Sequence, residues 1–494
     1  MKKNKKKNPI ILFKEFFNII FYNIYSCFIQ KKNTNISQFS MFKILAPNFT
    51  SLLHKPKYAL KNVSPISKTF FRSVTTLDNK YSPENYQKLY NSLTPVHQKI
   101  LKTPEIKMDR ILKTFTQDQI HQSEYERFMH ISSKSPWLLK TNSPAVVAVA
   151  ELFRIDKPAG TYLLLTPCIW SLTMSSIMLL SSYHGLTPPL IENISQFALQ
   201  TTLFIAGAYT MRSAGCVIND MHDRELDFKV WRSLQRPIAC GRISYSEAWA
   251  ALIALSAIGV AILYYGLPWQ CWWLGLASLP LIFVYPLFKR FTYYPQIVLS
   301  SCFNWGSLLG FAAIFGGFLY PYSKQEEEPN TTEIENKSLE IKDLPWRPMA
   351  GLYLTTFLWC MIYDTIYAHQ DKKFDIKANI KSTALKWGSK SKPILYVLAL
   401  VQCLALFDSC YDAGLIGQTK IFSTAGMLTF DYLLFRMIYK VNLDNPANCW
   451  HYFRRNVKYG QAFTIGLLLE YFYQLFKAAN KEEKEEDHSN KRLE

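Results

Sequence analysis

Apolar runs of about twenty residues recur from Gly160 to the C-terminal region, and they constrain the fold of this chain more than any other feature. Each run is far longer than the apolar stretch of a core strand and long enough to cross a bilayer as a helix. Only 19% of the residues are charged, against about 25% in an average soluble chain. A disordered or purely cytosolic protein is therefore excluded, and we predict an all-α, polytopic membrane protein with soluble ends.

The sequence predicts nine membrane-spanning helices, because nine runs have the length that a bilayer requires. Short basic loops alternate along the chain with loops that lack Lys and Arg or are net acidic, as the positive-inside rule expects. The alternation places the acidic loop 320–347 and the C-terminus on the side opposite the basic loops. The runs cover residues 160–181, 197–217, 246–266, 269–288, 296–319, 348–368, 394–412, 420–440 and 458–477.

The N-terminal residues 1–75 are predicted to be a basic, disordered targeting arm. Residues 1–77 hold thirteen Lys, one Arg and a single acid, and they supply most of the formal charge of +19. A basic surface can bind nucleic acid, but no recognition motif accompanies this one, so we expect no nucleic-acid partner. A segment poor in acids and rich in Ser, Asn and Lys is instead typical of an organellar presequence.

Three further parts follow this arm. Residues 76–145 are polar and predict a helical arm, with helices over 84–93 and 106–129. Residues 146–478 form the predicted membrane domain, interrupted by the acidic insertion 320–347. The charged tail 479–494 is expected to be disordered.

The strongest functional motif is Asn-Asp-Met-His-Asp-Arg-Glu-Leu-Asp, residues 219–227, at the basic end of the second predicted span. On a continuous helix Asn219, Asp220, Asp223 and Asp227 fall within an arc of about 100°. Carboxylates on one face repel one another unless a cation lies among them, and oxygen ligands favour Mg²⁺. The alternative is a solvated acidic patch beside the membrane.

A second acidic motif weakens that alternative. It occupies residues 363–375 at the basic end of the sixth predicted span, where Asp364, Asp371 and Asp375 share one helix face. Two acid-lined helix ends on the same side of the membrane suggest one site closed by both. Acidic groups at membrane depth are candidates for function, so we predict a shared metal–diphosphate site.

Basic residues around these motifs suit an anionic substrate. Arg232 and Arg236 follow the first motif, and a guanidinium group binds phosphate oxygens with two parallel hydrogen bonds. Tyr285 and Lys289 lie one helical turn apart in the fourth predicted span. For these residues the alternative is ordinary loop charge, or a side chain that extends to the membrane surface.

Arg212 is different because it lies inside the second predicted span. It precedes Asn219 by seven residues and shares its face of the helix. An arginine within a membrane needs an anionic partner. That partner is either an aspartate of the chain or a carboxylate of the substrate, and the sequence does not choose between them.

Taken together, these residues resemble the UbiA superfamily of membrane prenyltransferases. The first motif matches its Asn-Asp-x-x-Asp-x-x-x-Asp signature, and the resemblance covers residues from about 150 to about 475. Further stretches are similar to the branch that prenylates 4-hydroxybenzoate in mitochondrial ubiquinone biosynthesis. They are Arg154–Pro158, Met211–Cys216, Arg236–Ile238, Tyr285–Leu287, Phe303–Gly306, Asp364–Asp371 and Lys381–Thr383.

The resemblance implies a helical bundle in which two acidic motifs hold Mg²⁺ against a polyprenyl diphosphate. The implied metal ligands are Asn219, Asp223, Asp227, Asp364, Asp371 and Asp375, and the aspartates other than Asp375 are also implied to be catalytic. The diphosphate or the aromatic substrate would be bound by Arg154, Arg212, Arg232, Arg236, Tyr285 and Lys289. The prenyl group would pass to the ring carbon ortho to the hydroxyl of 4-hydroxybenzoate.

The resemblance also implies a place for the enzyme in the cell. It would be a multi-pass protein of the mitochondrial inner membrane, surrounded by membrane lipid, with its active site facing the matrix. Association with other ubiquinone-biosynthesis proteins is expected. One departure from the family pattern is that Lys373 and Phe374 precede Asp375 where relatives often carry acids, which predicts a tuned metal environment.

Two kinds of alternative stay open. Another member of the superfamily would use homogentisate, a naphthoate or haem as its acceptor. A transporter would use intramembrane acids to bind a coupling ion, with those acids near mid-span and with broken helices in repeated halves. The acids of this chain lie at helix ends beside arginines instead, which favours the prenyltransferase.

Overall fold

The computed structural model describes residues 80–182, 190–228, 233–325, 344–378 and 380–493. The chain divides into two compact units, Met1–Val149 and Ala150–Glu494. The described residues of both units form helices and no strand, which confirms the predicted all-α class. The basic arm 1–75 lies outside the described residues.

The helices of the first unit begin at side-chain caps. Ser82, Thr94 and Thr116 each accept a hydrogen bond from the backbone N–H three residues further on. A backbone N–H group in the first turn of each helix thereby has a partner. The predicted helix 84–93 is confirmed. The expectation of one helix over 106–129 is wrong, because Thr116 caps a new helix within that stretch. The elements are α4 (Pro83–Ser92), α5 (Pro95–Leu101), η1 (Glu105–Lys107), α6 (Met108–Ile111), α7 (Gln117–Lys134), α8 (Pro136–Lys140) and α9 (Pro144–Leu152), which continues into the second unit.

A buried carboxylate joins the helices of the first unit. Glu124 of α7 is 2% exposed, and it accepts hydrogen bonds from the Tyr86 hydroxyl at 2.7 Å and from the Thr103 backbone N–H at 2.5 Å. One turn further along α7, Arg127 donates to the carbonyl oxygens of Ile100 and Leu101. Both buried side chains therefore have hydrogen-bond partners within the unit.

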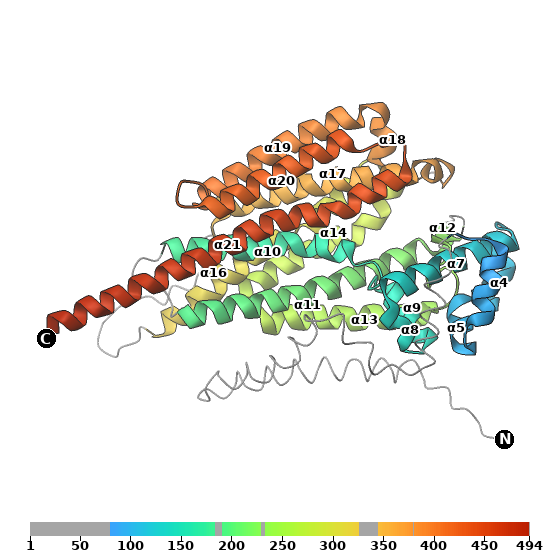
Figure 1. Ribbon diagram of the computed structural model, residues 1–494, viewed down its shortest axis with the longest axis horizontal. Helices are drawn as coiled ribbons and strands as arrows, with labels where there is room; N and C mark the ends of the chain where they lie inside the picture. The colour runs from blue at the N-terminus through green and yellow to red at the C-terminus, as the bar shows by residue number, and fades with distance from the viewer. Residues whose placement is uncertain (1–79, 183–189, 229–232, 326–343, 379, 494) are drawn as a thin grey trace, which may run out of the picture. The chain divides into compact units, whose positions relative to one another are not determined.

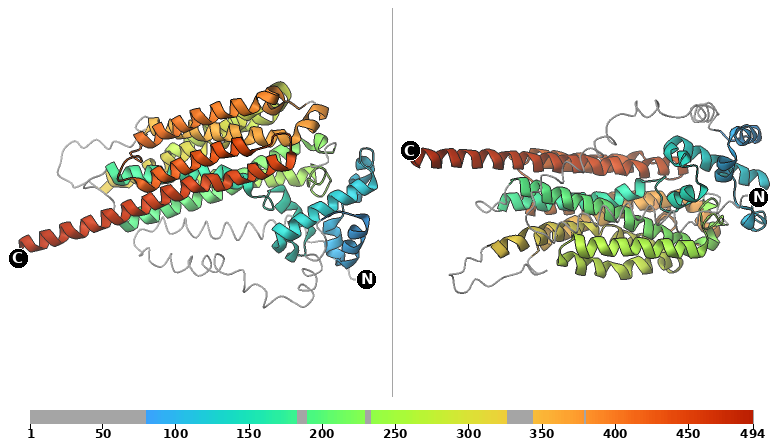
Figure 2. Two further views of the ribbon diagram at one scale, coloured as in Figure 1. Left: turned by 45° about the horizontal axis from the view of Figure 1, so that its top comes forward. Right: turned by 90° about the horizontal axis from the view of Figure 1, so that it is seen from below.

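Long helices that run side by side build the second unit (Figures 1 and 2). In Figure 1, α19 and α20 lie with α17 along one side of this unit, and α11 and α13 lie along the other. The long helices are α10 (Ala159–Ser182), α11 (Leu190–His222), α13 (Tyr245–Ala261), α14 (Trp269–Phe291), α15 (Pro295–Phe303), α16 (Gly306–Gln325), α17 (Trp346–Ala378), α19 (Ser391–Asp412), α20 (Ile421–Lys440) and α21 (Pro446–Leu493). Shorter elements are α12 (Arg224–Asp227), η3 (Ile262–Gly266), α18 (Thr383–Trp387) and η5 (Gly388–Lys390).

Each of the nine predicted spans falls on helical structure, but by length and composition six stretches in the described part of the chain can cross a membrane. The stretches 197–217, 269–288 and 458–477 are not among these six. The count of nine therefore stays a prediction. Most of the acidic insertion 320–347 lies outside the described residues, with α16 ending at Gln325 before it and α17 beginning at Trp346 after it.

Two helices differ from the sequence-based expectation. The fifth predicted span is broken between α15 and α16, where the Asn304 side chain donates to the Ser300 carbonyl oxygen at 2.8 Å and competes with the helical ladder. The charged tail is helical rather than disordered, because α21 continues to Leu493. Its Lys and Glu residues are good helix formers, and several pairs of opposite charge are spaced one turn apart.

An aromatic cluster forms the centre of the second unit. The rings of Trp170 in α10 and Trp359 in α17 stack with centroids 5.3 Å apart, and Phe430 and Phe463 meet Trp170 edge-on. Both indole N–H groups are satisfied, because Trp170 donates to Thr464 at 2.9 Å and Trp359 donates to Asn456 at 3.0 Å. Four helices from distant parts of the sequence are thereby packed through one set of rings.

Two glycines let α20 and α21 approach closely. A Cβ atom on Gly466 would lie 2.7 Å from the Phe422 carbonyl oxygen and 2.8 Å from the Cα of Gly426. Small residues at such crossings are typical of membrane helices, whose association depends on close packing. The fully buried Glu470 of α21 joins the same pair, since it accepts hydrogen bonds from the backbone N–H groups of Phe422 and Ser423 at the start of α20.

We expect Gly466→Ala to destabilise the protein, because the added methyl group meets backbone atoms that cannot move aside. Overpacking of this kind costs about 1–3 kcal/mol, and the midpoint of thermal unfolding in detergent should fall. The matched control is Gly215→Ala in α11, where a Cβ atom would meet nothing within 4 Å. An unfolding midpoint for Gly466→Ala at or above that of Gly215→Ala would contradict the close packing.

Candidate functional site

The first acidic motif does not form one continuous helix. Helix α11 ends at His222, and Asp223 has a non-helical conformation (φ −86°, ψ 3°) before α12 begins at Arg224. The acids of the motif therefore do not lie on one face of a continuous helix, and that expectation is wrong. The Asp223 carbonyl still accepts the backbone N–H of Asp227 at 2.9 Å, so the motif folds back as a compact turn.

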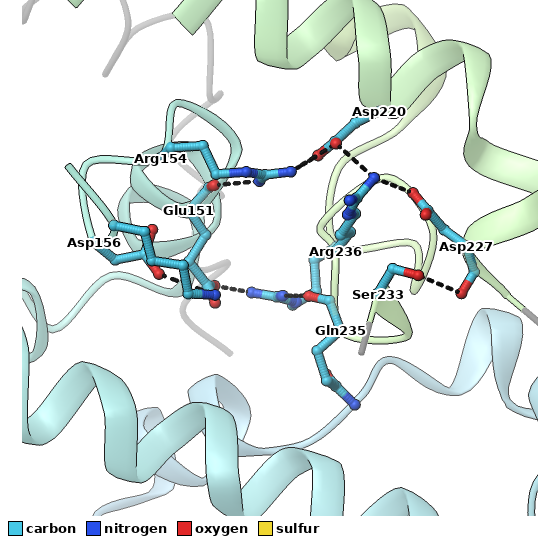
Figure 3. A network of polar contacts seen from close by, with 10 residues as sticks. Glu151, Arg154, Asp156, Asp220, Asp227, Ser233, Gln235 and Arg236 are labelled. Carbon is cyan, nitrogen blue, oxygen red and sulfur yellow. Dashed lines mark hydrogen bonds and ion pairs between the residues drawn. The ribbon is translucent and has the colours of Figure 1, made fainter. Parts of the chain in front are cut away.

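Two arginines balance the charges of this turn (Figure 3). Arg154 donates from one nitrogen to both oxygens of Asp220, at 2.6 and 2.8 Å. Arg236 contacts Asp220 at 3.2 Å and Asp227 at 2.9 Å through a single nitrogen atom. Because the Asp220 side chain is only 1% exposed, its charge needs these partners. Asp220 is thus the centre of the network.

Arg154 reaches Asp220 from an unusual backbone conformation. Its φ of 58° is left-handed, a region that residues other than glycine adopt at an energetic cost. The conformation occurs where the chain turns from α9 towards α10. It is held by a hydrogen bond from the Arg154 guanidinium group to the Glu151 carbonyl oxygen, at 2.8 Å. Backbone strain at a residue other than glycine occurs often at functional sites.

A buried ion pair fixes the loop that carries Arg236. Arg242 pairs with Glu151 and also donates to the carbonyl oxygen of Gln235, the residue next to Arg236. The side chains of Arg242 and Glu151 are 8% and 7% exposed. Removing one partner would leave the other charge buried and unpaired, which is strongly unfavourable. This pair therefore positions the Arg236 backbone against the first motif.

Burial and neighbouring charges shift the pKa values of two groups in and beside the acidic turn. Burial raises the pKa of the Asp227 carboxyl to about 6 against the opposing effect of Arg236. The nearby carboxylates of Asp220 and Asp223 raise this pKa further. Burial alone would lower the pKa of Arg236, but the three aspartates raise it above its ordinary value. A further cation among these carboxylates would relieve their mutual repulsion.

The second acidic motif lies on one uninterrupted helix, α17, which confirms that its aspartates share a helix. Asp364, Asp371 and Asp375 are all half-buried. Tyr367 of this helix lies within electrostatic reach of Arg236. The two motifs are therefore close to each other, although they are far apart in the sequence. The side chains of Lys373 and Phe374 are outside the described part of α17.

The described residues contain no group of three or more His, Cys, Asp or Glu side chains that could hold a metal alone. Mg²⁺ usually takes one or two carboxylates and completes its shell with water and substrate phosphates. The oxygen-only donors Asn219, Asp223 and Asp227 are of the kind that a hard cation prefers.

The remaining predicted residues differ in what surrounds them. Tyr285 is half-buried in α14. Arg232 and the side chain of Lys289 lie outside the described residues. Arg212 makes no ion pair with the described carboxylates, and its guanidinium lies over the ring of Phe303 at 5.6 Å. Lys381 donates to the Phe291 carbonyl oxygen at 3.2 Å.

Sequence reasoning missed three residues of the network. Asp220 belongs to the predicted acidic face, but the sequence assigns it no role, although it directly follows Asn219 in the motif. Glu151 and Arg242 were not singled out at all. The two residues are 91 positions apart, so no local sequence pattern relates their opposite charges. Only the fold shows that they form a buried pair.

The chain is similar to known proteins over most of its helical part. The family model described as the UbiA prenyltransferase family matches residues 164–464. A protein of Saccharomyces cerevisiae named 4-hydroxybenzoate polyprenyltransferase, mitochondrial, is 46% identical over 330 residues, which cover 67% of this chain and 78% of that protein. The protein of the same name from Schizosaccharomyces pombe is 39% identical, with 66% of this chain and 80% of that protein covered.

Among solved structures, the apo structure of a UbiA homolog from Aeropyrum pernix K1 matches 61% of this chain and 97% of its own, with 21% identity and a TM-score of 0.45. The assignment rests on the sequence matches, since the family model spans more than half of the chain. The matched segment includes both acidic motifs and the Arg236 loop between them. The chain belongs to the UbiA prenyltransferase family.

Proposed function

We propose that this chain transfers a polyprenyl group from polyprenyl diphosphate to the ring carbon ortho to the hydroxyl of 4-hydroxybenzoate, in ubiquinone biosynthesis. The observation that carries the proposal is the approach of the two acidic motifs, with Arg236 in electrostatic reach of three aspartates of the first motif and of Tyr367 in the second. The acceptor follows from the names of the relatives at 46% and 39% identity.

Magnesium is the cofactor that we propose for this site. Its proposed ligands are the residues expected from the sequence, namely Asn219, Asp223, Asp227, Asp364, Asp371 and Asp375. When bound, Mg²⁺ would stabilise the negative charge that develops on the departing diphosphate.

Other roles in the reaction are proposed for residues of the chain itself. Arg236 and Arg154 hold the first motif in shape. Arg232, Tyr285 and Lys289 are proposed to contact the diphosphate. An allylic cation must be kept from water, and the buried aromatic rings around Trp170 and Trp359 give the bundle a dry interior.

The proposed location is the mitochondrial inner membrane, with membrane lipid around the helices and the acidic motifs facing the matrix. Support comes from the names of the relatives, from the six apolar helices and from the basic loops on the side of the motifs. Association with other proteins of ubiquinone biosynthesis is part of the same proposal.

The function is tested with the purified full chain, polyprenyl diphosphate and 4-hydroxybenzoate, with and without Mg²⁺. We expect transfer that requires Mg²⁺, and we expect Asp223→Ala and Asp371→Ala each to lower kcat by at least 100-fold, because each removes a proposed carboxylate ligand. Asp408→Ala, at an exposed ion pair with Arg347, is the matched control and should leave kcat unchanged. Full activity in EDTA, or in either site variant, would refute the two-motif site.

The N-terminal arm is expected to direct import into mitochondria. A fluorescent reporter fused to residues 1–75 should enter mitochondria, because its acid-poor, basic composition is that of a presequence. The control replaces six of the lysines by glutamine and should stay outside. A wild-type arm that leaves the reporter in the cytosol would show that targeting lies elsewhere.

The topology is tested by protease added to mitoplasts, in which the inner membrane alone is intact. Since loop charge sets orientation, cleavage is expected within 320–347, with the basic loops 218–245 and 370–392 protected. Solubilising the inner membrane should then expose both basic loops. Cleavage of these loops in intact mitoplasts, with 320–347 protected, would reverse the proposed orientation.

A further inference from the structure

Helices α20 and α21 each carry two basic residues on one face. Arg436 and Lys440 are four residues apart near the end of α20, and Arg455 and Lys458 are three residues apart in α21. Residues at these spacings are neighbours on the surface of a helix. All four side chains are exposed, and together they are called the basic cluster below.

The packing of α20 against α21 brings the two arginines of the basic cluster together. The helices run side by side (Figure 1), and the Asn456 side chain of α21 contacts the sulfur atom of Met437 in α20 at 3.2 Å. These two residues directly follow Arg455 and Arg436 in the sequence. The Arg455 guanidinium lies beside the hydroxyl of Tyr459, and Arg436 is within electrostatic reach of the same hydroxyl. Two positive groups from different helices therefore lie near one hydroxyl group.

The basic cluster has no acidic partner in the described part of the chain. The ion pairs of the described residues do not include its four members. Asp431 of α20 accepts a hydrogen bond from the Gln402 side chain at 3.4 Å and so faces α19 instead. Glu470 of α21 lies at the opposite end of the pair, beside the start of α20. Like charges on adjacent faces repel one another, so an anion between them would be stabilising.

The basic cluster lies at the level where the membrane meets water. α20 is among the six stretches that can cross a membrane, and it ends at Lys440. Arg436 is four residues before that end, which is about 6 Å along a helix. Basic side chains near the ends of membrane helices extend to the lipid head groups. The rings of Phe453 in α21 and Tyr367 in α17 are 4.6 Å apart, so this is the end of the bundle that carries the second acidic motif.

An exposed apolar face continues from the basic cluster towards the middle of the membrane. Tyr432 and Leu428 precede Arg436 on α20 by one and two turns, and Ile465 follows Lys458 on α21 by two turns. All three of these apolar side chains are largely exposed. Such a face suits the acyl chains of a lipid whose head group lies at the basic cluster.

We propose that the basic cluster binds the phosphate of an anionic phospholipid, in the leaflet on the side of the second acidic motif. Two guanidinium groups present forks of hydrogen-bond donors that match phosphate oxygens. The two lysines add positive charge, which attracts anionic lipids and disfavours a head group that carries its own cation. The bound lipid would hold α20 against α21 at the end of the pair opposite to the close contact of Gly426 and Gly466. The proposal goes beyond prenyl transfer and does not rest on it.

The alternative is that these basic residues are only solvated, as charged ends of membrane helices often are. In that case, other exposed charges on the same side of the membrane would attract anionic lipid equally well. Lys386 and Lys390 provide the comparison, because both are exposed and lie in the basic loop 370–392. Replacing these two lysines removes the same number of charges as replacing the two arginines.

The test measures lipid binding to the purified full-length chain in detergent, titrated with phosphatidylglycerol or with phosphatidylcholine. Native mass spectrometry gives the dissociation constant of the first bound lipid. We expect the wild-type protein to prefer phosphatidylglycerol about tenfold, and Arg436→Gln/Arg455→Gln to lose this preference. Arg436→Lys/Arg455→Lys should keep part of it, because the charge remains without the planar fork. The control, Lys386→Gln/Lys390→Gln, should keep all of it.

Thermal unfolding in the same detergent gives a second measurement. Phosphatidylglycerol should raise the unfolding midpoint of the wild-type protein and of the lysine control, but not that of the double arginine variant. Arg436→Gln alone should reduce the preference for phosphatidylglycerol by a smaller factor, and it replaces the double variant if that variant does not fold.

Three results would overturn the proposal. The first is an unchanged lipid preference in the arginine variant that folds, and the second is an equal loss of preference in the lysine control. The third is a rise in the unfolding midpoint with inorganic phosphate alone that matches the rise with phosphatidylglycerol, because this would assign the basic cluster to a soluble anion.

Discussion

The Asp220 carboxylate is almost completely buried, and the arrangement of the candidate site depends on how its negative charge is balanced. Arg154 and Arg236 both contact it, one from the turn before α10 and the other from the loop after α12. A buried carboxylate without such partners would be strongly unfavourable. The ion pairs therefore hold three chain segments together at the end of α11 and fix the turn on which Asp223 and Asp227 lie.

The supports of this turn are buried and lie outside it. The Arg242–Glu151 pair holds the loop beside Arg236, while the stacked rings of Trp170 and Trp359 pack α10 against α17, the helix of the second acidic motif. Substrate-positioning groups act well only when neighbouring residues restrict their movement. The buried pairs and the aromatic core thus relate directly to the proposed chemistry, because both determine where the two acidic motifs lie.

The charged groups beside the first acidic motif hold its shape. Asp220, Glu151, Arg154 and Arg242 have partners within the chain, and they act as structural supports of the site. A buried charge is tolerable in a helix bundle only when it has such a partner.

The sequence by itself determined the helical class, the positions of the long apolar helices and the two acidic motifs, because these depend on local periodicity and composition. The break at Asp223, the break at Asn304 and the partners of Asp220 were decided by tertiary structure. Arg154 and Asp220 are 66 residues apart, and no local pattern relates them. A sequence motif shows which side chains a site contains. The ion pairs that compensate for the burial of those side chains form only when distant helices pack together.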